Sequence, residues 1–360
     1  MSRGPGLDAW LTLALTPGLG ASTLRRLLKE FGLPEEVLAA KRSALERFAP
    51  AEILNGLDAA ETRAAVERSL EWSESPGCHI VALSDPGYPR MLYEIADPPT
   101  LLFARGRIEL ANRPALAIVG SRNATPQGTA NAESFARSFS ASGVTIVSGL
   151  ALGIDAAAHR GALTGEGSTI AVLGTGVDVL YPARNAALAA EIAERGLLLS
   201  EFGLGTQPIA HHFPRRNRLI SGIGRGVLVV EAAVASGSLI TARSALEQGR
   251  EVFAIPGSIH SPLSKGCHGL IKSGAKLVDS VEDVLAELGG WRHASTLEPA
   301  PAQTAEEPGL LAHMGFDPVD LDALCARAGM PPEQVSAQLL RLELDGRVAA
   351  LPGGRFQRRN

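Results

Sequence analysis

The sequence has few cysteines, few aromatic residues and no long apolar run, and each shortage excludes a class of protein. Its three cysteines, Cys78, Cys267 and Cys325, are far apart and odd in number, which fits neither a disulfide framework nor a metal-binding spacing. No uninterrupted apolar run approaches the roughly 18 residues of a membrane span. The N-terminus lacks the charged-then-apolar pattern of a secretory signal. We therefore expect a cytoplasmic protein with no metal site and no membrane partner.

Only 4% of the residues are aromatic, although 45% are hydrophobic and glycine and alanine are abundant. This composition supports a sizeable core of aliphatic and small side chains, as in helices packed closely on a sheet. A length of 360 residues allows two or three domains. We place them at residues 1–75, 76–290 and 310–360, with a linker at 291–309.

The segment 76–290 alternates short apolar runs with helical stretches. The runs cover residues 115–119, 144–147, 169–173, 197–200, 227–230 and 252–255, and a weaker one covers 276–278. Near-continuous apolar runs of this length are typical of parallel strands that are buried on both faces. The pattern predicts an α/β fold with a Rossmann-like, doubly wound and mostly parallel sheet. In such sheets, ligands bind at the carboxyl ends of the strands.

The two flanking segments predict small helical units. Between residues 13 and 32, a PGLG turn joins two helices in a SAM-like or helix-hairpin-helix-like arrangement, in which turn amides meet DNA phosphates. Glycines that simply turn a helical pair also fit this sequence. Residues 295–308 have a linker composition. Beyond them, two helices and a hairpin resemble a winged-helix domain, whose second helix has a predicted apolar side of Val335, Leu339, Leu342 and Leu344.

A basic segment, His211–Arg225, lies between two predicted strands. It reads HHFPRRNRLISGIGR, with four arginines and no acidic residue, in a chain of net charge −4. Arginines for phosphates and a ring, here Phe213, for base stacking are the usual means of holding single-stranded nucleic acid. The alternative is a solvated helix face whose arginines pair with nearby carboxylates.

Glycine-rich turns follow three of the predicted strands, at residues 117–128, 147–163 and 172–182. In the first, Gly120 permits the turn, Ser121 faces the crevice, and Arg122 lies where a phosphate would bind. This turn is not a GxGxxG motif and no acidic residue ends the next strand, so we predict no dinucleotide cofactor. In the second turn, Gly149 brings the backbone close to whatever fills the crevice.

Three further residues could be either catalytic or structural. Asp155 and His159 are four residues apart on one predicted helix face. They would form either an acid–base pair or a helix-start aspartate that is held by a histidine one turn later. Glu231 follows the strand at 227–230, where it could be catalytic or could accept hydrogen bonds from loop amides or from an arginine.

Four long motifs occur in a characteristic order: SGLALGIDAAAH, FPRRNRLISG, VVEAAVASGSLITARSALEQGREVFAIPG and KGCHGLIKSGA. Over roughly residues 85–288 they resemble the DNA-processing protein A family (DprA, also called Smf). The resemblance implies a bacterial protein without catalytic activity or cofactor. Such a protein binds and protects incoming single-stranded DNA and loads RecA on it during natural transformation.

The resemblance also implies DNA contacts at matching positions. Arg122 matches the arginine after the GS turn, and Lys265 belongs to the late basic loop. Some relatives place a lysine a few residues before the phenylalanine, where this chain has Ala210, His211 and His212. The full predicted DNA site comprises Gly120, Ser121, Arg122, Gly149, His211, Phe213, Arg216, Asn217, Arg218 and Lys265.

Two other functions fit the same architecture. One is a nucleotide-processing enzyme that resembles the phosphoribohydrolases. Those enzymes carry PGGxGTxxE after the corresponding strand, whereas this chain reads EAAVASGSLITA. The other is an adaptor whose tail binds a protein. We also expect a homodimer, with Leu270 and Ile271 as candidate exposed contacts.

Overall fold

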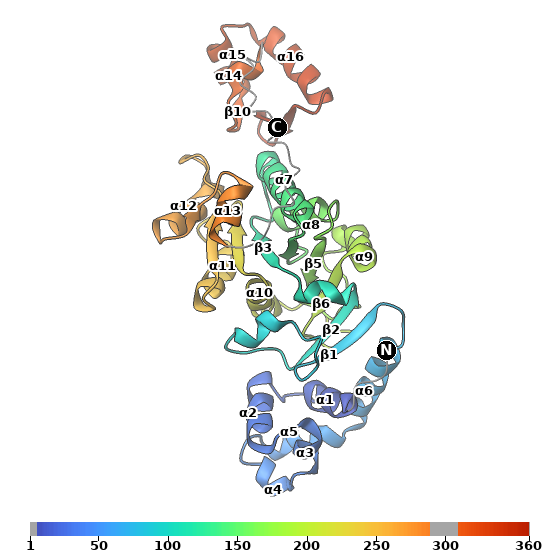
Figure 1. Ribbon diagram of the computed structural model, residues 1–360. Coiled ribbons are helices and arrows are strands. Elements are labelled where there is room, and N and C mark those ends of the chain that lie inside the picture. The colour runs from blue at the N-terminus through green and yellow to red at the C-terminus, as the bar shows by residue number, and fades with distance from the viewer. Residues whose placement is uncertain (1–5, 289–308, 360) are drawn as a thin grey trace.

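The computed structural model describes residues 6–288 and 309–359 (Figure 1). The chain begins with six short helices: α1 (Leu7–Leu15), α2 (Ala21–Phe31), α3 (Pro34–Ala39), α4 (Arg42–Leu45), α5 (Ala51–Asn55) and α6 (Ala60–Ser73). The predicted helix pair is confirmed, because α1 and α2 flank the PGLG turn. Leu13, Leu24 and Leu27 are fully or almost fully buried between these helices.

A nine-stranded sheet follows, with the order β1-β2-β6-β5-β4-β3-β7-β8-β9. Its strands are β1 (Cys78–Ala82), β2 (Leu101–Gly106), β3 (Ala115–Val119), β4 (Thr145–Ser148), β5 (Thr169–Val172), β6 (Leu197–Ser200), β7 (Gly226–Val229), β8 (Glu251–Ala254) and β9 (Lys276–Leu277). All predicted strands are present, and β3 to β9 run parallel. The antiparallel strands β1 and β2 were not indicated by the sequence, because their runs stand outside the strand–helix alternation.

Helices cover both faces of this sheet. One face carries α10 (His212–Ile223), α11 (Gly237–Glu247) and α12 (Lys265–Lys272), and the other carries α7 (Pro126–Ala141), α8 (Ile154–Ala162), α9 (Ala186–Arg195) and α13 (Val281–Glu287) (Figure 1). Alternate residues of β3 point to opposite layers, as a strand requires: Ala117 lies in the first and Ile118 in the second. Leu270 and Ile271 are half-buried against the first layer rather than fully exposed.

The chain reverses direction across the sheet between β3 and β7. From β3 it proceeds through β4 and β5 to β6 on one side, and then returns to build β7, β8 and β9 on the other. The loops after β3 and β7 therefore diverge and leave a crevice between them, which is where open α/β sheets bind ligands.

The C-terminal unit has winged-helix topology, as predicted. It comprises α14 (Leu311–Met314), β10 (Val319–Asp320), α15 (Leu321–Ala328), α16 (Pro332–Leu344), β11 (Val348–Leu351) and β12 (Arg355–Arg358). Val335 and Leu339 are buried and Leu342 is half-buried, but Leu344 is 81% exposed. The expectation for Leu344 is wrong because nine residues turn it about half a revolution away from Val335. Of the predicted linker at 291–309, residues 291–308 lie outside the described residues.

Short 3₁₀ turns complete the described chain: η1 (Gly56–Asp58), η2 (Arg90–Glu94), η3 (Ile108–Asn112), η4 (Ala183–Asn185) and η5 (Pro262–Ser264). Within residues 6–288 and 309–359, none of the helices combines the length and apolar character that crossing a membrane requires.

Candidate functional site

A crevice of about 480 Å³ opens at the reversal point of the sheet. The loop after β3, the loop before α11 and the inner side of α10 form its walls. Among the predicted DNA-site residues, those that line it are Gly120, Ser121, Arg122, Phe213, Arg216 and Asn217. Gly149 lies directly behind it, whereas His211, Arg218 and Lys265 do not line it. The fold thus gathers residues from two distant segments of the chain.

The turn after β3 presents a free cation. A Cβ atom on Gly120 would lie 2.6 Å from Ile154 Cγ1, so only glycine lets this turn pack against α8. Ser121 is buried, and its hydroxyl accepts a hydrogen bond from the amide of Asn123 at 3.1 Å. Arg122 is exposed and forms no hydrogen bond or ion pair with any residue that the structure describes. Its guanidinium is therefore available to an anionic ligand.

Arg216 supplies charge to the floor of the crevice. It is only 4% exposed, and its Nη1 donates hydrogen bonds to the carbonyl oxygens of Gly149, at 2.7 Å, and of Val172. Burial lowers the pKa of Arg216 to about 10, and the negative charge of Asp155 opposes that effect. Arg216 is therefore charged at neutral pH, but two of its hydrogen bonds already join the ends of β4 and β5.

Gly149 is required by this arrangement. A Cβ atom at that position would lie 2.7 Å from Arg216 Nη1. The predicted role of Gly149, close approach of backbone to a ligand, is here a close approach of backbone to Arg216. The glycine shapes the floor of the crevice through that side chain.

Asp155 and His159 hold the loop after β4. Asp155 Oδ2 accepts hydrogen bonds from the amides of Gly149, at 3.1 Å, and Ala151, at 3.3 Å. His159 Nε2 accepts one from the amide of Leu150 at 3.3 Å. Leu150 has a φ of 58°, a left-handed conformation that side chains seldom adopt, and these bonds retain it. Both side chains thus serve the loop instead of forming an acid–base pair.

The protonation of His159 follows from its second partner. Its Nδ1 lies 2.7 Å from Thr169 Oγ1, and that hydroxyl donates its hydrogen to the carbonyl of Ile146. Nδ1 must therefore carry a hydrogen, and because Nε2 accepts one from the Leu150 amide, the ring is neutral. Complete burial, with the nearby Arg216 charge, lowers the pKa of His159 to about 3.

Glu231 has a similar structural task. Its carboxylate accepts hydrogen bonds from the amide of Thr125 at 2.9 Å and from the hydroxyl of Thr125 at 2.6 Å. Burial raises the pKa of Glu231, while these bonds act against the rise. Of the alternatives for Glu231, hydrogen bonding to loop groups is the one observed. It ties the end of β7 to the start of α7.

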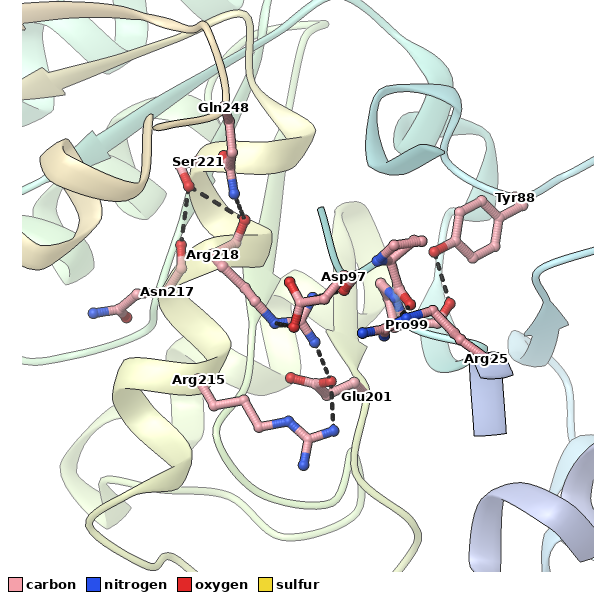
Figure 2. Close-up of polar contacts among 11 residues, drawn as sticks. Arg25, Tyr88, Asp97, Pro99, Glu201, Arg215, Asn217, Arg218, Ser221 and Gln248 are labelled. Carbon is pink, nitrogen blue, oxygen red and sulfur yellow. Dashed lines mark hydrogen bonds and ion pairs between the residues drawn. The ribbon is translucent and has the colours of Figure 1, made fainter. Parts of the chain in front are cut away.

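Arg218 does not face the crevice, contrary to its predicted place in the DNA site. Figure 2 shows it against Glu201 and Asp97. Its Nη2 lies 2.5 Å from Glu201 Oε2, and its Nη1 donates to the carbonyl of Asp97 at 2.6 Å. The Arg218 and Glu201 side chains are 11% and 2% exposed. Arg218 thus follows the alternative interpretation of the basic segment, in which its arginines pair with nearby carboxylates.

The remaining predicted residues, His211 and Lys265, lie around the site rather than in it. Arg215, which was not predicted to contact DNA, also pairs with Glu201 Oε2, at 2.9 Å, but is 45% exposed (Figure 2). His211 is exposed, and its ring lies 4.6 Å from that of His212, centroid to centroid, with the two planes at 79°. Lys265 is exposed, and its Nζ donates a hydrogen bond to the carbonyl of Ile259. Direct roles of His211 and Lys265 in DNA binding therefore stay predictions.

Phe213 is half-buried at the mouth of the crevice. A Cβ atom on Gly174 would lie 2.8 Å from Phe213 Cδ1, so the absence of a side chain at Gly174 makes room for the ring. Gly174 is a site residue that the sequence did not single out, although its position in the third glycine-rich turn was a usable signal.

Across the part of the chain that is described, no three His, Cys, Asp or Glu residues gather as metal ligands would.

Comparison with known proteins decides the family. A family model described as DNA recombination-mediator protein A matches residues 79–289, and a model of the DprA winged helix domain matches residues 294–354. The chain belongs to the DNA recombination-mediator protein A family. The resemblance carried by the sequence motifs is thereby confirmed.

Individual members of this family align over most of their length. Protein Smf of Escherichia coli K12 is 46% identical over 303 residues, which cover 81% of this chain and 80% of that protein. The X-ray structure of DprA from Streptococcus pneumoniae matches with a TM-score of 0.68 and 40% identity, over 80% of this chain and 99% of that one. A DprA structure from Helicobacter pylori, described for its single-stranded DNA binding mode, matches with a TM-score of 0.54 and 31% identity, over 58% and 95%.

Proposed function

We propose that this member of the family is a non-enzymatic protein that binds single-stranded DNA at the crevice. The observation that carries the proposal is Arg122, exposed and bonded to none of the described residues, beside the half-buried ring of Phe213. A guanidinium suits a phosphate, and an aromatic face suits a base that is free of its complement. The single-stranded DNA binding named for the Helicobacter pylori structure supports the same ligand here.

The electrostatics of the crevice support an anionic ligand. Arg216 places a buried positive charge at the floor, and Arg122 adds an exposed one at the rim. Asp155 also lines the crevice, but it is 7% exposed and burial raises its pKa, while the Arg216 charge and the loop amides act against that rise. We infer that Arg122 makes the direct phosphate contact and that Arg216 strengthens it at a distance.

In the cell, we propose that the bound strand is DNA entering during natural transformation. The protein would protect it and load RecA on it in the cytoplasm, acting as a homodimer whose two crevices hold one strand. Membership of a recombination-mediator family supports this role. Half-burial of Leu270 and Ile271 means that only part of each side chain is available to a dimer contact.

The alternative, a phosphoribohydrolase-like enzyme, would need a free acid or base at the crevice. Glu231 is bonded to Thr125, and the hydrogen bonds of Asp155 and His159 go to the loop after β4. Incubation with nucleoside monophosphates should release no free base. Base release by the wild type that is lost in Glu231→Ala would establish the enzyme instead.

Fluorescence anisotropy with labelled oligonucleotides tests the binding function. We expect tighter binding to single strands than to blunt duplex, and an affinity that falls steeply as salt rises because phosphate-bound counterions are released. Arg122→Ala should weaken binding by about 1–3 kcal/mol, as for a hydrogen bond to a charged group. Arg160→Ala is the matched control, since Arg160 is also exposed but lies on α8 outside the crevice. Equal affinity for duplex, or no effect of salt, would refute the proposal.

A further inference from the structure

A second hollow adjoins the crevice, with a volume of about 450 Å³. It shares Arg122, Phe213, Asn217 and Gly237 with the crevice, so the two are continuous. Its other walls are apolar or aromatic, and none of the residues that line it is acidic. We call this hollow the outer groove.

The outer groove contains an aromatic residue that the sequence did not indicate. Tyr181, in the loop after β5, is 47% exposed, and its ring centroid lies 5.6 Å from that of Phe213 with the planes tilted by 40°. Only partial contact exists between rings at that separation and tilt, so much of the Tyr181 surface is open to a ligand.

Hydrogen bonds join the loop that carries Tyr181 to a second loop of the outer groove. The amide of Gly176 donates to the carbonyl of Thr206 at 3.0 Å, and the amide of Gly205 donates to Asp178 Oδ1 at 2.9 Å. The loop that carries Tyr181 is therefore joined to the loop that leads to Pro208 and Ala210 on the facing wall. Loops that are held together by the fold lose less entropy when a ligand binds between them.

We propose that the outer groove is a base-stacking subsite and that Tyr181 stacks a nucleobase next to the one on Phe213. The inference rests on the proposed function and extends it. The two rings provide separate surfaces for neighbouring bases, and Arg122, which borders both hollows, lies where the phosphate between those bases would pass. Stacking of this kind tolerates any base, because every base has a π-face.

The test compares Tyr181→Ala with wild type for binding of an oligothymidine and of an abasic strand of equal length, by anisotropy. For the oligothymidine we expect at least a tenfold loss, equal to about 1.4 kcal/mol. For the abasic strand we expect no difference between the two proteins, since no base is present to stack. Tyr181→Phe should retain wild-type affinity, because the ring remains. Leu180→Ala is the matched control, since Leu180 is 39% exposed but does not line the groove.

A second measurement keeps the test independent of folding defects. Tyr181→Trp should lose indole fluorescence when oligothymidine binds, whereas Leu180→Trp should not. Wild-type binding of single strands together with unchanged affinity in Tyr181→Ala would overturn the subsite and leave the proposed function standing. An equal loss for the abasic strand, or a Tyr181→Phe variant as weak as Tyr181→Ala, would also overturn it. Failure of the wild type to bind any single strand would instead refute the proposed function.

Discussion

Replacing Arg218 by alanine should destabilise the protein far more than it weakens DNA binding. The Glu201 carboxylate is 2% exposed, and Arg218 is the better buried of its two arginine partners. Removing one partner of a buried ion pair typically costs about 3–5 kcal/mol, because a charge is left without compensation. Arg215 remains 2.9 Å from Glu201 Oε2, so we expect a value near the lower end, about 3 kcal/mol.

Urea unfolding followed by circular dichroism measures this loss as a lower midpoint at an unchanged slope. Arg215→Ala is the matched control: its side chain is 45% exposed, so its ion pair should contribute at most about 1 kcal/mol. Because a buried ion pair is often replaceable by apolar groups, Arg218→Met combined with Glu201→Leu should recover much of the stability.

DNA affinity provides the opposing readout. Arg218 does not line the crevice, so the folded fraction of Arg218→Ala should bind single strands within about threefold of wild type, less than 0.7 kcal/mol. A variant with wild-type stability and more than tenfold weaker binding would refute the reasoning. It would show that Arg218 leaves Glu201 and contacts DNA, as the family motif implies.

Four further predictions address the site and the tail. Phe213→Ala should weaken single-strand binding by about 1–3 kcal/mol through lost stacking; unchanged anisotropy titrations would place the ligand elsewhere. Gly149→Ala should lower the urea midpoint, because its Cβ atom would lie 2.7 Å from the buried Arg216 guanidinium; a wild-type midpoint would contradict that contact. His159 is neutral in the fold, where its pKa is lowered to about 3, so below about pH 6.5 the unfolded chain binds a proton that the folded chain does not. The free energy of unfolding should therefore fall as the pH drops below about 6.5, by up to about 1.4 kcal/mol per pH unit. His159→Gln should be less stable than wild type at pH 7 but lose stability less steeply with falling pH, and parallel pH profiles of the two proteins would exclude this account. Truncation at Trp291 should leave single-strand affinity within tenfold of that of the full chain, because the two glutamates of α16, Glu333 and Glu343, outweigh the positive charge of its single arginine. If the truncated fragment is folded but loses more affinity than that, the winged helix is a DNA-binding element.

The sequence by itself determined the parallel strands, the helix pair and the winged helix. Runs such as residues 115–119 and 227–230 are buried on both faces, so their composition alone indicates a strand. The long motifs determined the family, and they contain most of the residues that line the crevice. The antiparallel strands β1 and β2 escaped this reasoning, because pairing across the irregular residues 83–100 is a property of the folded sheet.

Only the tertiary structure decided which arginine is free. Arg216 lies three, four and seven residues before Leu219, Ile220 and Ile223, so its position on the buried side of α10 was readable from the helical period. Its partners, the carbonyls of Gly149 and Val172, were not readable, because they lie at the ends of β4 and β5, far from α10 in the sequence. In the sequence alone, Arg218 and Arg122 are both arginines of motifs that predict DNA contacts, and nothing distinguishes the paired one from the free one. Arg218 meets the Glu201 carboxylate at the end of β6, whereas the turn after β3 holds Arg122 at the open reversal point of the sheet with no carboxylate bonded to it among the described residues. The physical reason is that pairing of a charge depends on what the fold places within a few ångströms of it, and local sequence does not contain that distance.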